Sequence, residues 1–224
     1  MDEYTIQPSP ARASYAPSHR LNVYKNFRHG RMIAWNDFAG TTHANSTSEK
    51  SLYTLCGGST LSGIVLPFKF DSQGLGIQFP GNFFPSGGQV KLTFYGSFTS
   101  LVAATEITWY TACYTTSLAE NLTLFKTTVV PGDDEWAAWK LDVTYSFFHG
   151  SATDFTIRYV TGYGNLELMN TSTGIGAFYP LVPQLSDPSE TFESGVNILA
   201  SVTFDTESAN NSITGLGFEV IQYT

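Results

Sequence analysis

From residue 62 onward, apolar and polar residues alternate with a period of two in most of the chain. This is the pattern of β-strands with one buried face. Gly, Pro, Asn and Ser collect between the runs, and no segment has the 3.6-residue period of an amphipathic helix. The clearest runs are 90–98, 107–114 and 139–147, and weaker ones are 64–70, 77–79, 122–130, 155–160 and 178–182.

The last thirty residues carry two long alternating runs. Val196, Ile198 and Phe204 share one face of the first run, and Leu216 and Phe218 share one face of the second. The polar stretch 206–212 separates them. Two alternating runs joined by a short polar stretch predict a hairpin, so the chain is expected to close on one.

Other regions are predicted from their turn residues. Residues 37–51 and the Gly-, Asn- and Ser-rich passage from Val160 to Gly176 are interpreted as loops. Residues 21–60 leave open either short strands or a strand with one helical turn.

Eight or nine strands at spacings of about ten to twenty residues indicate a sandwich or barrel. We predict an all-β protein, an antiparallel β-sandwich with the eight strands of a jelly roll and an extended N-terminal arm. An immunoglobulin-like sandwich is the main alternative, but its Cys…Trp…Cys signature is absent. The predicted division is an arm and loop over residues 1–45 and a jelly-roll domain over residues 46–224.

The low share of charged residues bears on how much of the surface faces solvent. Charged residues make up 13% of the 224 residues, about half the usual share, whereas 42% are hydrophobic. We interpret the low charge as a sign that outer surfaces are buried against copies of the same chain. Residues 1–31 carry five basic and two acidic side chains, and the remainder carries six basic and seventeen acidic ones. A weakly basic arm and an acidic body are therefore expected, or a solvated segment that lacks acids by chance.

The arm contains Pro8, Pro10 and Pro17 and no hydrophobic pattern, so it should be disordered when isolated. If it is ordered, we expect a neighbouring subunit to hold it. No apolar run reaches the ~18 residues of a membrane span, and no signal-peptide core is visible at the N-terminus. Cys56 and Cys113 are too few for a disulfide scaffold, and Cys113 is expected to be a buried apolar residue.

Catalytic motifs do not stand out. The four histidines are not spaced as metal ligands, and neither a G-x-S-x-G elbow nor a phosphate-binding loop is present. Asp142 and Glu106 are candidates for a carboxylate pair, although outward-facing solubilising charges explain them equally well. We therefore expect no enzymatic activity.

Asp133, Asp134 and Glu135 form one acidic cluster after a Pro-Gly turn. Adjacent carboxylates supply the oxygen ligands of calcium, so this cluster is the candidate metal site, and a solvated turn is the alternative. No other cofactor is expected.

Aromatic residues on polar faces or in loops suit either sugar binding or subunit contacts. They are Tyr95, Tyr110, Tyr114, Trp136 and Tyr163.

The strand pattern resembles that of viral structural proteins with a single jelly roll, over roughly residues 60–224. The likeness is carried by residues 89–98, the run Trp139-Lys140-Leu141-Asp142-Val143, and the closing segments 196–203, 210–213 and 218–220. The closing pattern is also similar to that of TNF-like viral appendage modules. Small icosahedral coats of this kind carry a dense Arg/Lys arm, which is missing here, so the resemblance does not extend to genome packaging.

The resemblance implies a capsid protein located in the virion that self-assembles through jelly-roll packing and its arm. Expected partners are copies of itself and other capsid proteins, with a weak nucleic-acid contact of the arm and no membrane. The alternative is a TNF-like trimeric module that binds a receptor or carbohydrate at its loop tips.

Overall fold

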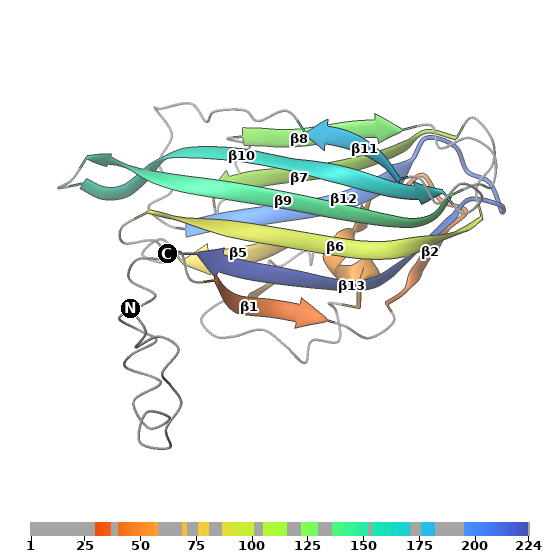
Figure 1. The fold of residues 1–224 in the computed structure, drawn as a ribbon, viewed down its shortest axis with the longest axis horizontal. Helices are drawn as coiled ribbons and strands as arrows, with labels where there is room; N and C mark the ends of the chain where they lie inside the picture. Colours follow the sequence, from red (N-terminus) through yellow and green to blue (C-terminus); the bar gives the residue numbers. More distant parts are fainter. Residues whose placement is uncertain are drawn as a thin grey trace, which may run out of the picture.

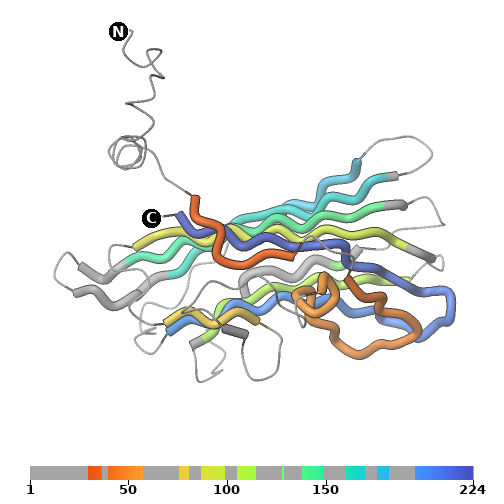
Figure 2. Tube along the Cα trace, turned by 90° about the horizontal axis from the view of Figure 1, so that it is seen from below, coloured from red at the N-terminus to blue at the C-terminus, as the bar shows by residue number. Residues whose placement is uncertain are grey.

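Two antiparallel β-sheets pack face to face in the computed structural model (Figures 1 and 2). The structure describes residues 30–36, 40–57, 69–70, 76–80, 87–100, 105–115, 122–129, 136–151, 154–170, 176–181 and 195–223. Asp133, Asp134, Glu135 and residues 1–29 of the predicted arm lie outside these ranges.

The larger sheet has seven strands, and its outer face is in front in Figure 1. Their order is β1 (Gly30–Asn36), β13 (Ser212–Tyr223), β6 (Gly88–Ser100), β9 (Trp136–Ser151), β10 (Asp154–Asn170) and β11 (Gly176–Leu181), with β2 (Thr42–Ala44) beside β13. The smaller sheet has six strands. Their order is β4 (Lys69–Phe70), β5 (Gly76–Pro80), β12 (Gly195–Phe204), β7 (Ile107–Thr115) and β8 (Leu122–Val129), with β3 (Lys50–Ser51) beside β12.

Eight of these strands have the order of a jelly roll. The larger sheet contains β1-β13-β6-β9 and the smaller sheet contains β5-β12-β7-β8. The first of the eight pairs with the last, the second with the seventh, the third with the sixth and the fourth with the fifth. A two-stranded ribbon wrapped around a common core has this pairing. The predicted eight-stranded antiparallel sandwich is confirmed, and the hairpin β10–β11 extends the larger sheet beyond it.

β1 lies within the range predicted as the arm. It pairs with β13 from Gly30 opposite Tyr223 to Asn36 opposite Phe218. Residues 42–44 and 50–51, predicted as loop, are the short strands β2 and β3. The division between an arm and a domain stays a prediction.

The inward faces of both sheets form one core. On β9, Leu141, Val143 and Phe147 point into the core and are at most 1% exposed, and Thr144 and Ser146 on the outer face are also buried. One turn of helix, α2 (Leu52–Leu55), fills the space between the sheets beside β13. Its Tyr53 ring lies edge-on to Phe94 of the larger sheet, and its hydroxyl donates to the Ile198 carbonyl of the smaller sheet at 3.1 Å.

The predicted closing hairpin is wrong. β12 pairs with β5, β3 and β7 of the smaller sheet, whereas β13 pairs with β1, β2 and β6 of the larger one. Residues 205–211 therefore form an arch from one sheet to the other. The two apolar faces, with Val202 on β12 and Val220 on β13, contribute to the same core instead of sharing one sheet.

Two further predictions differ from the structure. Residues 161–170, predicted as loop, belong to β10, because Leu166 and Leu168 point into the core opposite Leu141 and Trp139. Leu216, predicted to face inward with Phe218, is 40% exposed. The register of β13 shifts between residues 215 and 217, and such a bulge inserts one extra residue that turns away from the core.

Candidate functional site

The outer face of the larger sheet has an ion-pair network at its centre. Asp142 on β9 lies between Lys140 on the same strand and Lys91 on β6, at 2.5 and 3.3 Å from its carboxylate oxygens. The Thr93 hydroxyl donates to the same carboxylate at 2.6 Å. Three donors to one carboxylate hold Asp142 in place, so we assign Asp142 a structural role on this face.

The protonation of this network follows from its contacts. Burial raises the pKa of Asp142, but hydrogen bonds from Lys140 and Thr93 and the charge of Lys91 outweigh burial, so the pKa lies below its usual value. The hydrogen bond to Asp142 raises the pKa of Lys140. Both groups are therefore charged at neutral pH, and Asp142 is not a general acid there.

Large apolar side chains stand in solvent on the same face, at the edge formed by β10 and β11. Tyr163, Met169 and Phe178 are 55%, 57% and 66% exposed, and we call these three residues the β10–β11 strip. Phe178 pairs with Glu167, and Met169 pairs with Gly176. The Phe178 ring leans back over Gly176, since a Cβ built there would lie 3.6 Å from it. Because Gly176 pairs with Met169, the ring leans toward the Met169 position.

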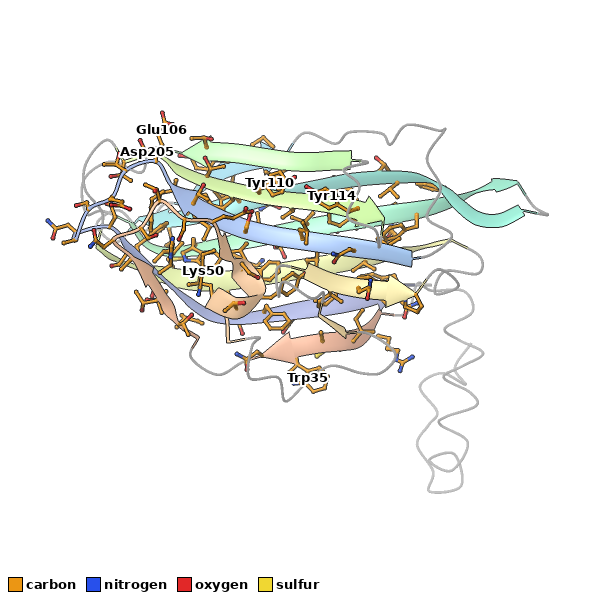
Figure 3. All side chains as sticks on the ribbon, turned by 180° about the vertical axis from the view of Figure 1, so that it is seen from behind. Trp35, Lys50, Glu106, Tyr110, Tyr114 and Asp205 are labelled. Carbon is orange, nitrogen blue, oxygen red and sulfur yellow. The ribbon has the colours of Figure 1, made fainter. Side chains whose placement is uncertain are left out.

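The opposite edge of this face, formed by β1, exposes less apolar surface. Met32 on β1 is 40% exposed, and Trp35, labelled in Figure 3, is half-buried beside Glu219. Among the described residues, the three most exposed large apolar side chains of the larger sheet therefore lie on β10 and β11, and Phe148 of β9 follows at 50%.

The outer face of the smaller sheet carries a tyrosine pair. Tyr110 and Tyr114 lie along β7 (Figure 3), with their hydroxyl oxygens 2.5 Å apart. Both flank Ala112, and their strand neighbours on β12 are Ser201 and Asn197. Both tyrosines are half-buried, whereas Ser201 and Asn197 are at most 2% exposed, so the tyrosines are the part of this group that reaches the surface.

Metal ligands do not gather in the part of the chain that the structure describes. No group of three or more His, Cys, Asp or Glu side chains there could hold a metal ion. Cys56 and Cys113 are both free and buried, and burial raises the pKa of the Cys56 thiol to about 12. The thiolate that would react is therefore scarce at neutral pH. Within the described ranges, no helix is long and apolar enough to cross a membrane.

The candidate carboxylates and tyrosines named from the sequence lie in different parts of the structure. Asp142 lies in the larger sheet, whereas Glu106 is exposed at the start of β7 in the smaller sheet, and its backbone N–H donates to the Asp205 carboxylate at 2.9 Å. The structure does not bring these two acids together. Tyr163 stands in solvent as predicted, whereas Tyr95 is half-buried on the outer face beside Lys140.

The exposed positions of Met169 and Phe178 are not predicted by the sequence pattern. Residues 161–175 were interpreted as loop, and residues 178–182 as an apolar run with no inward or outward side. Pro180 was the available signal, because proline in a strand marks an edge, where side chains are easily exposed.

Comparison with known proteins gives similarities of fold alone. No family model and no curated protein matches the sequence. The structure is similar to the CBM2 module of the evolved Dit of Lactobacillus casei BL23 phage J-1, at 10% identity and a TM-score of 0.35, covering 88% of this chain and 97% of the module. It is also similar to alginate lyase A1-II' of polysaccharide lyase family 7, at 11% identity and a TM-score of 0.27, covering 85% and 95%. The alginate lyase from Corynebacterium sp. follows at 10% identity and a TM-score of 0.24, covering 86% and 94%. Values this low carry no conclusion about function.

Proposed function

We propose that this chain is a structural protein of a virus particle, a capsid protein that assembles with copies of itself. The observation that carries the proposal is the β10–β11 strip of exposed apolar side chains on the outer face of the larger sheet. The inner face of this sheet already forms the core, and yet Tyr163, Met169 and Phe178 project into solvent from its outer side. Exposed apolar patches of this kind mark interaction surfaces, and Tyr, Phe and Met are enriched in them.

The low share of charged residues supports the same proposal, since a surface covered by neighbours does not need charge to stay in solution. Partners would be copies of this chain and other shell proteins. The basic N-terminal residues would add at most a weak contact to nucleic acid.

Sedimentation velocity and electron microscopy of the purified protein test the proposal. We expect assemblies larger than a monomer at micromolar concentration. Assembly driven by apolar contacts should persist in 1 M sodium sulfate, because this salt strengthens apolar burial. A protein that stays monomeric at every concentration up to 100 µM would overturn the proposal.

A second candidate function is carbohydrate binding by an appendage module. The Tyr110–Tyr114 pair favours it, since half-buried tyrosine rings on a sheet face offer both an apolar ring and a hydroxyl to a sugar. A glycan array with the Tyr110→Ala/Tyr114→Ala variant as its control tests this function. Binding lost in the variant supports it, and the absence of any binding by the unchanged protein rejects it.

A further inference from the structure

The hairpin β10–β11 is an addition to the jelly roll. The eight jelly-roll strands end at β9 in the larger sheet, and β10 and β11 continue the sheet past that point (Figure 1). Its inner face is closed, because Leu166, Leu168 and Leu181 are at most 5% exposed. The hairpin therefore needs no apolar residue on its outer face for its own stability.

Three large apolar side chains nevertheless stand on the outer face of this hairpin, with Asn165 and Glu167 between Tyr163 and Met169 along β10. At ~200 Å² for a large side chain, the exposed fractions of Tyr163, Met169 and Phe178 leave on the order of 350 Å² in water. A standard interface buries about 800 Å² on each partner. The β10–β11 strip is thus large enough to form the apolar centre of such an interface, with the neighbouring polar residues as its rim.

The surroundings of the strip indicate what kind of surface it meets. Glu167 lies opposite Phe178, and Lys140 lies opposite Glu167 on the next strand. Glu219 and Lys91 lie farther along the same face. A patch that carries both signs beside an apolar centre complements itself, because a second copy turned about a two-fold axis can oppose lysines to glutamates.

Strand pairing through the β11 edge is a poor alternative to a contact through the outer face. β11 is the last strand on its side among the described residues, and its residue 180 is proline, which has no N–H to donate. A proline in an edge strand blocks continued strand pairing. Two copies would therefore meet through their faces instead of extending one sheet.

We propose that the β10–β11 strip binds the outer face of a second copy of this chain. This inference rests on the proposed function and specifies which surface joins two subunits. Phe178 and Met169 are its apolar centre, and Lys140 and Glu167 set the orientation of the two copies.

The test compares two variants by sedimentation velocity over a range of concentrations. Met169→Ser/Phe178→Ser removes the apolar centre, and Met32→Ser removes an exposed apolar side chain from the opposite edge as the matched control. We expect the double variant to raise the concentration for half-assembly at least tenfold, since central apolar residues dominate interface energies, and the control to leave it within about twofold. Thermal unfolding followed by circular dichroism verifies that both variants are folded.

Each outcome has one meaning. Equal assembly of the unchanged protein and the folded double variant overturns this inference and leaves the proposed function in place. A monomeric unchanged protein overturns both. If the double variant does not fold, Tyr163→Ser tests the same strip with a single exposed change.

Discussion

Asn211 is completely buried although it lies in the polar arch between β12 and β13. Its side chain accepts a hydrogen bond from the Thr105 hydroxyl at 3.2 Å and donates to the Thr206 carbonyl at 3.1 Å. Its backbone N–H donates to Ser208, and its carbonyl accepts from the N–H of Asn45. One residue therefore joins the arch to β2 and to the start of β7.

Replacing Asn211 should destabilise the protein. Asn211→Ala leaves the Thr206 carbonyl and the Thr105 hydroxyl without this partner in a buried site, so we expect the free energy of unfolding to fall by about 2 kcal/mol. Urea unfolding measures the change. Asn210→Ala, which alters an exposed side chain in the same arch, is the control and should change the free energy by less than about 0.5 kcal/mol.

His43 is a buried base. Its ring stacks on Phe204 with centroids 5.4 Å apart, and its Nε2 has no hydrogen-bond partner among the described residues. Burial, together with the charge of Lys50, lowers the pKa of His43 below its ordinary value of 6.5. The unfolded chain therefore takes up a proton at this residue at a higher pH than the folded protein does.

This difference predicts a pH dependence. Well above pH 6.5, His43 is neutral in both states and does not change the free energy of unfolding. As the pH falls from 6.5 toward the lower pKa of the folded state, the free energy of unfolding should decrease, because the unfolded chain takes up the proton first. His43→Phe keeps an aromatic ring against Phe204 and removes the titration. Urea unfolding at pH 7.5 and 5.5 should show a smaller decrease for this variant, and an equal decrease in both proteins would show that His43 is not the cause.

The arch places β12 and β13 in different sheets, whereas in a meander these consecutive strands would pair with each other. Thr42 of β2 lies opposite Thr214 of β13, with their hydroxyl oxygens 2.8 Å apart. A hairpin that turned at Ser208 would instead place Val202 opposite Thr214. Two cysteine pairs therefore distinguish the two arrangements.

Thr42→Cys/Thr214→Cys should form a disulfide on mild oxidation, because side chains of directly opposed antiparallel residues come within bonding range. Val202→Cys/Thr214→Cys should stay reduced, since these residues belong to different sheets. Mass spectrometry after maleimide labelling counts the free thiols. The native Cys56 and Cys113 are buried and should give the same background in both variants. A disulfide in the second pair alone would contradict the arch.

The whole molecule is a two-layer sandwich, and its most exposed large apolar side chains among the described residues stand on β10 and β11. Its core unites the inner faces of both sheets, and its outer faces differ: the larger carries the β10–β11 strip and the Asp142 network, and the smaller carries the Tyr110–Tyr114 pair. The proposed assembly would use the outer face of the larger sheet and leave that of the smaller sheet for other contacts.

The acidic cluster Asp133, Asp134 and Glu135 lies outside the described residues, and its calcium site stays a prediction. If these carboxylates bind calcium, 5 mM CaCl₂ should raise the midpoint of thermal unfolding by several degrees, since a ligand of the folded state stabilises it. Asp133→Asn/Asp134→Asn/Glu135→Gln should abolish the rise. Magnesium at the same concentration is the control for ionic strength, and an equal midpoint with and without calcium would reject the site.

The strand faces were predictable from the chain alone. Trp109 and Cys113 were expected on one face of their strand and are buried, and Asp142 was expected on the opposite side from Leu141 and lies on the outer face. Period two is a local property of an extended backbone, so alternation reports which residues share a face. The same argument predicted an all-β sandwich, whereas Tyr163 was expected in solvent because its passage was interpreted as a loop.

The partners of each strand were decided only by the tertiary structure. Val202 and Val220 have the same alternating surroundings whether their strands form a hairpin or an arch, because the pattern contains no information on which distant backbone completes the hydrogen bonds. For the same reason the exposed side chains of Met169 and Phe178 could not be assigned before β10 and β11 were paired. Alternation identifies two faces of a strand, and only packing decides which of them meets water.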